Sequence, residues 1–497
     1  MSNPTPMSPV LLSRYLGQQY PPTDQQAAVI GAEPGPLLVV AGAGAGKTET
    51  MAARVVWLVA NGYARPDEVL GLTFTRKAAQ EMGKRIRDRL GSLAANTDLV
   101  RRLDPSGELA KNLEVIAPSV STYDSYAGEL IREYGLLVPV EPDARLITDA
   151  ELHAIATDVV VNYSGGLITE LGSNPSLSTV VEDLLALTTA MGNELASPEW
   201  VREHAHDFLA ETESYPMAPR ARVEFTQVLT KWRSKQEMRV NMLPLVEELA
   251  AELRRRGVVT FNEQMSVAAK LARDHQTVGE SQRSRYRVVM LDEYQDTSHA
   301  QRVLLRSLFG EGTDPSLTVT AVGDPMQAIY GWRGATAANL AAFVEDFPSP
   351  AGPAPKKQLT TSWRNPPEVL DLANGVSDAV LGTAEDRAVA QLEPRPAADA
   401  GDVTLGFFPD QDAEIAYVAD ALAQEYQAAS QEGRALSAAA LVRKNRHSPV
   451  LAAALEERGV PYEIVGLAGL LDVPEVADTV AIATMLVRPD DTAAALR

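Results

Sequence analysis

The sequence predicts an α/β fold in which helices cover both faces of a parallel β-sheet. Four short runs of apolar residues are each followed by a loop and a helical pattern. Strands of a parallel sheet are buried on both faces, so they appear in a sequence as uninterrupted apolar runs. Ligands of such sheets bind at the carboxyl ends of the strands. We therefore expect the functional residues just after the runs, which are Leu37–Ala41, Val69–Phe74, Val288–Leu291 and Leu317–Val322.

Length and composition limit the possible classes of protein. A chain of 497 residues corresponds to about three domains. It contains no cysteine, which excludes disulfides, cysteine-ligated zinc and iron–sulfur clusters within this chain. The first residues lack the basic and apolar regions of a signal peptide, and no apolar stretch is long enough to span a bilayer. We expect a cytoplasmic protein without membrane contact.

The net charge of −21 argues against nucleic-acid binding as a general property of the surface. Local fields can differ from the sum. Residues 76–102 hold eight basic and three acidic side chains, and Lys231–Lys235 places a tryptophan among basic residues. From charge alone, solvated helix faces on an acidic protein explain these stretches, and a nucleic-acid surface is the alternative.

The pattern along the chain changes twice. Helical periodicity dominates between about residues 125 and 285, for example in Leu243–Arg256, which indicates a helical insertion into the sheet domain. A connector rich in proline and glycine, residues 346–355, precedes a second α/β pattern. The predicted domains are a sheet domain from 1–124 and 285–345, an insertion from 125–284 and a second sheet domain from 346–497, with strands at Val403–Phe408, Ala438–Val442 and Tyr462–Gly466 and a turn-rich loop at Pro394–Gly401.

The strongest local motif is the glycine-rich loop that follows the first run. Its glycines let the backbone N–H groups surround an anion, Lys47 reaches the β- and γ-phosphates, and the Thr48 hydroxyl binds Mg²⁺ at the start of the next helix. A strand–helix turn without a ligand is the alternative. The predicted ATP-binding loop consists of Ala41, Gly42, Ala43, Gly44, Ala45, Gly46, Lys47 and Thr48.

The third run ends in two carboxylates that complement this loop. Asp292 is expected to hold Mg²⁺ together with Thr48, and Glu293 to polarise the attacking water. An apolar run that ends in Asp-Glu is common by itself. Together with the glycine loop it indicates hydrolysis of a nucleotide, with ATP and Mg²⁺ as the expected cofactors.

Four further segments identify the type of nucleotidase, and they are Leu72–Met82, Leu291–Thr297, Val322–Ala335 and Leu359–Asn365. Together, and in this order, they resemble the motifs of the UvrD/Rep-like superfamily 1 DNA helicases. Thr23–Gln26 resembles the glutamine motif that recognises adenine in that family, and Ser121–Tyr126 resembles its second DNA-contact motif.

The resemblance implies a P-loop NTPase with two RecA-like motor domains, a helical insertion in the first, and ATP-driven 3′→5′ translocation that unwinds duplex DNA in repair or recombination. It assigns adenine recognition to Gln26 and stacking on adenine to Trp363, where the family usually has tyrosine. Gln327 senses the γ-phosphate and Arg364 reaches it from the second domain. The expected catalytic residues are Lys47, Asp292, Glu293, Gln327 and Arg364.

Aromatic side chains near the ATP motifs are candidates for stacking on bases, which tolerates any sequence. The expected partners are single-stranded DNA and duplex–single-strand junctions. Packing in the core is the alternative for Phe74, Tyr123 and Trp332. The predicted DNA-binding residues are Thr73, Phe74, Thr75, Tyr123, Tyr330, Trp332 and Arg333.

Three positions depart from the family pattern. Glu49, Asp124 and Met326 look closer to the motor subunits of heterodimeric bacterial helicase–nucleases, which makes a second such subunit a candidate partner. The late helicase motifs are not found, so we expect the chain to end inside an incomplete second motor domain. The alternative function is a DNA-binding P-loop subunit or fragment with weak or silent ATPase that serves as a structural arm of a larger complex.

A cluster of possible metal ligands lies at Glu203, His204, His206 and Asp207. On a helix, residues two positions apart do not face one another. We therefore do not expect a metal site there.

Overall fold

The computed structural model describes residues 6–138, 144–165, 175–215, 225–310, 314, 316–331, 334–335, 337–381, 389–465 and 474–487. These residues form two compact units, 1–401 and 402–497, each of which is described by itself. Among the described helices, none is both long and apolar enough to cross a membrane.

Unit 1 is built on a six-stranded parallel sheet with the strand order β3-β2-β6-β7-β1-β8. The predicted α/β fold with a parallel sheet is confirmed, and the four predicted strands are present with bounds that differ by at most one residue at either end. The strands are β1 (Leu37–Ala41), β2 (Val69–Thr73), β3 (Ser119–Thr122), β6 (Val288–Leu291), β7 (Thr318–Gly323) and β8 (Lys356–Leu359).

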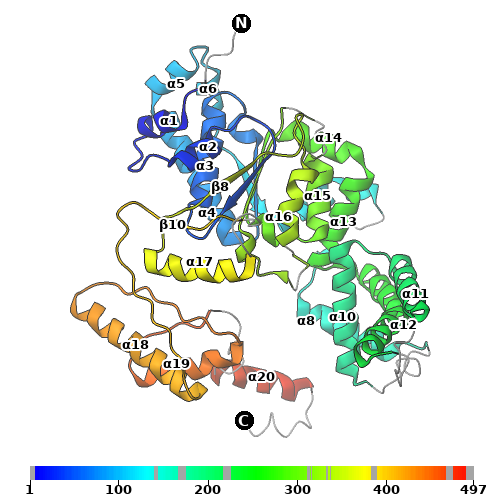
Figure 1. The fold of residues 1–497 in the computed structure, drawn as a ribbon. Coiled ribbons are helices and arrows are strands. Elements are labelled where there is room, and N and C mark those ends of the chain that lie inside the picture. The colour runs from blue at the N-terminus through cyan, green and yellow to red at the C-terminus, as the bar shows by residue number, and fades with distance from the viewer. Residues whose placement is uncertain are drawn as a thin grey trace. The chain divides into compact units, whose positions relative to one another are not determined.

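Helices cover both faces of this sheet because alternate side chains of each strand point to opposite sides. Val39 of β1 faces one core and Val40 faces the other. In Figure 1 the blue helices α3 and α4 and the green helices α13 and α15 lie on opposite sides of the strands. The first face carries α1 (Pro9–Tyr15), α2 (Asp24–Ile30), α3 (Lys47–Ala60), α4 (Arg76–Ala95), α5 (Thr97–Leu103) and α6 (Glu108–Asn112), and the second carries α7 (Tyr123–Tyr134), α13 (Phe261–Asp274), α14 (Gln276–Arg285), α15 (His299–Phe309) and α16 (Ala337–Asp346).

The helical insertion has its own hydrophobic core, whose members run from Ile147 to Val258. This core lies within the predicted range 125–284 but is shorter at both ends. Helices α7, α13 and α14 flank it in the sequence, yet they pack on the main sheet. Helical periodicity shows which face is apolar and not which element covers it. The insertion holds α8 (Asp149–Asn162), α10 (Leu177–Glu194), α11 (Pro198–Ser214) and α12 (Gln227–Arg255), with a two-stranded parallel pair at its base, β4 (Arg145–Leu146) and β5 (Val258–Val259).

The segment after residue 346 stays with the first unit. Strand β8 pairs in parallel with β1, so the first sheet extends past the predicted domain boundary at residue 345. Residues up to Gly401 belong to the same compact unit. This stretch continues through β9 (Thr361–Ser362), α17 (Pro367–Leu381) and β10 (Glu393–Pro394), where β9 and β10 form a short parallel pair.

Unit 2 contains α18 (Gln411–Gln431), α19 (Ser448–Glu457) and α20 (Pro474–Val487). The first two pack on each other through a small apolar core. The strands predicted at Val403–Phe408 and Ala438–Val442 are wrong, because neither segment pairs with a neighbouring strand. Residues 462–465 of the third predicted strand are also unpaired, and residue 466 lies outside the described residues. A run of apolar residues becomes a strand only where a neighbour accepts its hydrogen bonds.

Candidate active site

The phosphate loop joins β1 to α3 and has the backbone that an anion site requires. Gly44 and Gly46 both have a φ of 75°, a left-handed conformation that favours glycine. Gly46 is the N-cap of α3 and provides no side-chain cap. The N-cap residue therefore does not occupy the first N–H groups of α3. These groups and the helix dipole suit a phosphate.

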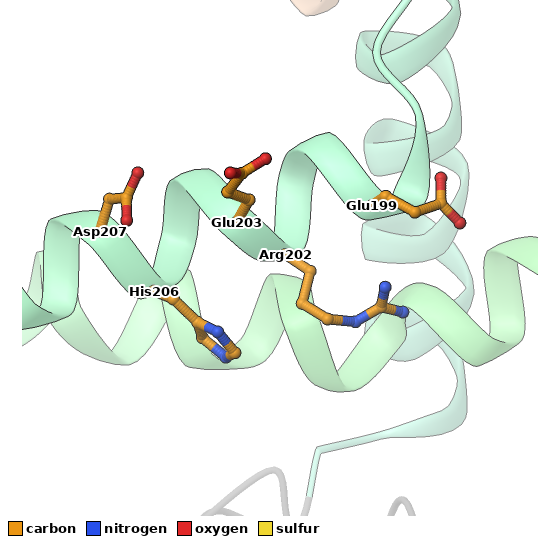
Figure 2. A pocket seen from close by; sticks show the side chains of 5 residues that line it. All are labelled: Glu199, Arg202, Glu203, His206 and Asp207. Carbon is orange, nitrogen blue, oxygen red and sulfur yellow. The ribbon is translucent and has the colours of Figure 1, made fainter.

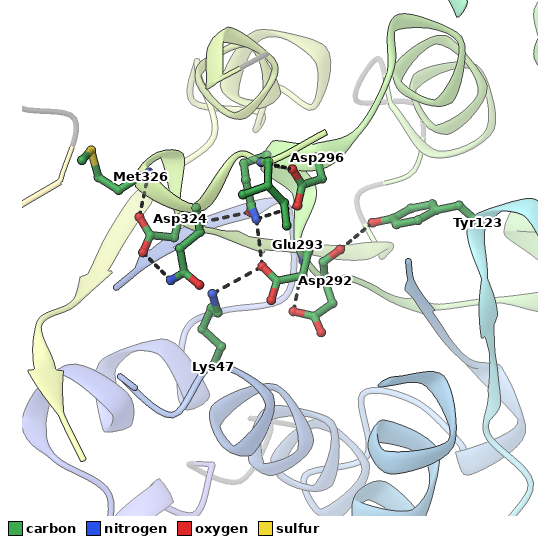
Figure 3. A network of polar contacts seen from close by, with 10 residues as sticks. Lys47, Tyr123, Asp292, Glu293, Asp296, Asp324 and Met326 are labelled. Carbon is green, nitrogen blue, oxygen red and sulfur yellow. Dashed lines mark hydrogen bonds and ion pairs between the residues drawn. The ribbon is translucent and has the colours of Figure 1, made fainter. Parts of the chain in front are cut away.

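Lys47 and Glu293 face each other beneath this loop. Lys47 Nζ lies 3.3 Å from Glu293 Oε2, and Figure 3 shows the ammonium group directed at the carboxylate. Glu293 follows β6 and has a φ of 51°, which is uncommon for a residue with a side chain. Such strained residues cluster at functional sites and typically cost about 1–3 kcal/mol. The structure thus brings together two of the predicted catalytic residues, which are 246 positions apart.

Asp292 is almost fully buried at the end of β6. Burial and the negative charge of Glu293 raise the pKa of its carboxyl to about 7, against the opposing effect of Lys47. A cation at this carboxylate would favour its ionised form. The side chains of Asp292 and Thr48 offer the oxygen ligands that Mg²⁺ prefers, so the residues present fit the metal. Bound Mg²⁺ would neutralise charge on the phosphates.

The predicted adenine residues lie against the loop. The ideal Cβ position of Gly46 lies 3.0 Å from Gln26 Nε2, while Gln26 Oε1 accepts a hydrogen bond from the Thr23 N–H in a capping box. The Trp363 N–H donates to the Gly44 carbonyl at 2.9 Å. Among the described residues, the indole Nε1 of Trp363 is one of five buried side-chain atoms without a hydrogen-bond partner.

Two residues near the adenine side are not among the predictions. The Gln25 carboxamide exchanges hydrogen bonds with Thr360, which ties α2 to the strand end before Trp363. The ring of Tyr20 lies 6.0 Å from that of Trp363. Tyr20 lies outside the predicted motifs, and Gln25 lies inside the glutamine motif without an assigned role, so only the tertiary structure reveals this arrangement.

Arg364 lies on the same side of the phosphate loop. Its side chain is exposed, and its Cβ is 2.8 Å from the ideal Cβ position of Gly44. Any side chain at position 44 would collide with it. The close approach explains why the loop needs glycine there in addition to the backbone conformation, and it places the Cβ of Arg364 against the phosphate loop.

Arg54 is a buried residue that sequence reasoning missed. It donates to the carbonyls of Val29 and Ile30 at the end of α2 and to Thr320 Oγ1 in β7. Burial lowers its pKa to about 10. The arginine thereby fixes the helix that carries Gln26 against α3 and the sheet. The one available signal was a lone arginine in the otherwise apolar stretch of α3.

The loop after β7 is organised by Asp324. Its Oδ2 accepts from Gln327 Nε2 at 2.7 Å, and its Oδ1 accepts from the Met326 N–H at 3.0 Å. Figure 3 shows Asp324 and Met326 on the side of Glu293 away from Tyr123. The predicted γ-phosphate sensor, Gln327, is therefore held by its own loop near the carboxylates.

Aromatic rings from three separate segments meet beside the carboxylates. The rings of Phe74 and Tyr330 are stacked, with centroids 5.9 Å apart and planes within 10°. Tyr123 packs behind Phe74 at 4.9 Å, and its hydroxyl donates to the Asp292 carbonyl. Phe74 and Tyr330 are partly exposed, so they can offer a stacking surface.

The structure corrects two predicted DNA contacts. Thr73 and Tyr123 are each 1% exposed, so neither can touch a strand directly. Thr73 lies inside β2 and Tyr123 supports Phe74 from within the core. Thr75 is exposed and caps α4 by accepting from the Ala78 N–H. The remaining two predictions, Trp332 and Arg333, lie outside the described residues.

The basic stretch of α4 is partly neutralised within the protein. Arg85 and Arg89 both form ion pairs with Glu49, which stands directly after the phosphate-loop threonine. Arg76 and Lys77 are exposed at the start of α4, next to Thr75. Arg76 and Lys77 are thus exposed basic side chains that follow Phe74 closely in the sequence.

The acidic and histidine-containing cluster on α11 has a different arrangement. Figure 2 shows the Glu203 and Asp207 carboxylates pointing away from the His206 ring. His204 stacks on Trp200 with ring centroids 4.1 Å apart. Within the described part of the chain, no group of three potential ligands is placed to hold a metal ion.

Comparison with known proteins agrees with the motifs. The model of the UvrD/REP helicase N-terminal domain matches residues 22–348, and the model of the UvrD-like helicase C-terminal domain matches residues 358–497. The chain belongs to the UvrD/REP helicase family. The family resemblance carried by the sequence motifs is therefore confirmed.

Relatives in this family are distant but match almost the whole chain. ATP-dependent DNA helicase UvrD1 of Mycobacterium tuberculosis is 28% identical over 483 residues, which are 94% of this chain and 52% of the relative. UvrD2 of the same organism is 27% identical, covering 95% and 59%. PcrA of Leuconostoc citreum is 25% identical, covering 95% and 53%. The chain spans about half the length of these curated relatives.

Proposed function

We propose that this chain is an ATP-driven DNA motor that moves 3′→5′ on single-stranded DNA and unwinds duplexes during repair or recombination. The observation that carries the proposal is the ion pair between Lys47 and Glu293, 3.3 Å apart beneath an anion-binding loop. Family membership and the names of the relatives support DNA as the substrate. The direction of movement rests on the resemblance of the motifs alone.

The ion pair gives the ATP site a defined resting state. Lys47 neutralises Glu293 when no phosphate is present. A bound γ-phosphate competes for the ammonium group, and the released carboxylate can then accept a proton from the attacking water. Asp292 and Thr48 hold the metal in this scheme, while Gln327 and Arg364 contribute donors to the developing charge.

The nucleic-acid side of the proposal rests on the rings of Phe74 and Tyr330. A partly exposed stack suits unpaired bases, and the adjacent Arg76 and Lys77 suit the phosphate backbone. Trp332 and Arg333 stay predictions for the same surface. A second helicase–nuclease subunit also stays a prediction.

The decisive experiment measures ATP turnover with and without an oligo-dT single strand. The Lys47→Ala variant is expected to lose at least about 100-fold in turnover, since it removes a charged donor from the transferring phosphoryl group. Lys111→Ala is the matched control, because Lys111 pairs with Glu108 on the surface. Equal turnover in both variants would contradict the assignment. DNA binding without turnover in the unchanged chain would support the alternative, a DNA-binding arm with a silent ATPase.

A further inference from the structure

A buried glutamine, Gln295, links the ATP carboxylates to both loops that carry the predicted sensing and stacking residues. It lies in the 3₁₀ turn η3 (Tyr294–Asp296), two positions after Glu293. Its side chain is 1% exposed, so water does not supply its hydrogen bonds. None of the roles assigned above uses it.

The carboxamide of Gln295 acts as donor and acceptor at once. Its Nε2 donates to Glu293 Oε2 at 2.9 Å and to Asp296 Oδ2 at 3.2 Å. Its Oε1 accepts from the Asp324 N–H at 3.0 Å. A primary amide provides this combination, whereas a carboxylate would have no donor for its two acidic neighbours.

One branch from Gln295 leads to the loop after β7. The Asp324 backbone is held by Gln295, and the Asp324 carboxylate in turn holds Gln327. A displacement of Glu293 that moves the Gln295 carboxamide therefore also changes the anchor of the predicted γ-phosphate sensor.

The other branch leads to the aromatic stack. Asp296 Oδ1 accepts from the Ile329 N–H at 3.1 Å, and the Asp296 carboxylate also accepts from the Tyr330 N–H. Tyr330 stacks on Phe74. The path from the water-polarising carboxylate to the base-stacking ring thus runs through one amide and one carboxylate. Figure 3 shows Asp296 near Glu293 at the end of this network.

The backbone makes room for this amide. A Cβ on Gly323, the last residue of β7, would lie 2.6 Å from Gln295 Oε1 and 2.9 Å from Leu340 Cδ1. Glycine at this position is required for close approach, since any side chain would push the carboxamide away. Gln295 in η3 and Gly323 at the end of β7 therefore serve the same contact.

We propose that Gln295 is a positioning residue that couples the nucleotide state of Glu293 to the single-strand surface at Phe74 and Tyr330. The inference rests on the proposed function. In the absence of nucleotide, Glu293 Oε2 receives both Lys47 and Gln295. When a phosphate takes Lys47, Gln295 becomes the remaining donor to that oxygen. The hydrogen bonds of Gln295 to Asp296 and Asp324 then adjust together with it.

The test uses binding, so it does not depend on turnover. Fluorescence anisotropy of a fluorescein-labelled oligo-dT measures the Kd of the full chain with and without Mg²⁺–AMP-PNP. Coupling between two sites is reciprocal and typically amounts to about 5–150-fold. We expect the Kd of the unchanged chain to shift by at least about fivefold with nucleotide.

Two variants interrupt the contact in different ways. Gln295→Glu replaces the donor by an acceptor, and Gly323→Ala displaces the carboxamide without changing its chemistry. Both should bring the ratio of the two Kd values to within about twofold of one, while each ligand alone binds nearly as before. Gln301→Glu is the matched control, because Gln301 Oε1 accepts from the Ser298 N–H in a capping box that glutamate can also form.

The outcomes separate the inference from the proposed function. If neither oligo-dT nor AMP-PNP binds the unchanged chain, the proposed function fails. If both bind but the ratio is one, or if both variants keep the ratio of the unchanged chain, the coupling role of Gln295 is overturned. Thermal unfolding of each variant is measured in parallel. If Gln295→Glu does not fold, the ratio of Kd values of Gly323→Ala decides the coupling role of Gln295.

Discussion

Single polar residues define the geometry of the predicted ATP site. Glu293 is held in a left-handed conformation, and Arg54 satisfies the carbonyl groups at the end of α2. Buried polar groups are expensive unless they are paired, so their partners are well determined. The aromatic residues follow the same principle: Tyr123 is held by the Asp292 carbonyl and supports the half-exposed Phe74.

A prediction at this scale concerns Tyr330. Tyr330→Ala should weaken binding of oligo-dT by about 1–3 kcal/mol, because a stacking surface for one base is lost. The affinity for Mg²⁺–ATP without DNA should hardly change. Tyr63→Ala is the control. Tyr63 lies between α3 and β2, at the amino ends of the strands, whereas Tyr330 follows the carboxyl end of β7. Anisotropy titrations measure both, and equal affinities of the two variants would refute the stacking role.

At the scale of elements, α13 shows how tertiary packing overrides local preference. Glu263 is the third residue of α13, and acidic side chains are favoured near a helix N-terminus. Its N–H donates to the Thr260 side chain, which caps the helix. Its Oε2 is nevertheless buried without a hydrogen-bond partner. Burial raises the pKa of the Glu263 carboxyl, and Arg254 opposes the rise.

The raised pKa predicts a pH-dependent effect of Glu263→Gln. A carboxyl whose pKa is higher in the folded state favours folding below its unfolded pKa, and this contribution is lost as the pH rises through the folded pKa. Glutamine stays neutral at every pH, so the variant does not lose this contribution to the free energy of unfolding as the pH rises. The variant should therefore gain more stability over the unchanged chain at pH 8 than at pH 4.5, as measured by thermal unfolding.

The exposed Glu81 on α4 provides the control for this experiment. Glu81→Gln should shift the unfolding temperature by similar small amounts at both pH values. A stability difference for Glu263→Gln that is the same at pH 4.5 and pH 8 would show that burial of the carboxyl does not govern its effect.

At the scale of the molecule, the described residues of the predicted nucleotide site belong to unit 1. The side chains that surround the phosphate loop come from residues before 402, including Gln26, Trp363 and Arg364. Strand β8 closes the sheet beside β1, which carries the loop. The boundary at residue 345, suggested by the proline-rich connector, would leave β1 as an uncovered edge.

This arrangement predicts the behaviour of two truncated chains. Residues 1–401 should fold and bind a fluorescent ADP analogue with Mg²⁺ about as well as the full chain. Residues 1–345 should be less soluble and bind it poorly, since an exposed apolar edge strand promotes aggregation. Gel filtration and fluorescence titration test this. Equal nucleotide binding by both truncations would show that the segment 346–401 is dispensable for the site.

The sequence by itself determined four of the six strands of the main sheet and the motifs that place the chain in its family. Leu37–Ala41 and Val288–Leu291 are buried on both faces, so every residue in them is apolar. An uninterrupted apolar run can be read directly from the sequence. The glycine loop and the Asp-Glu pair combine local backbone freedom with fixed chemistry, so they are recognisable without a structure. Family membership follows from their order along the chain.

Only the tertiary structure decided which residues meet. Thr73 and Tyr123 became buried supports, and Val403–Phe408 formed no strand. The contacts of Gln295 could not be recognised from its motif, since its three hydrogen bonds join residues from two strand ends that are brought together only by folding. Local sequence sets the preference of each segment, whereas burial and hydrogen-bond partners depend on neighbours that are distant in the chain.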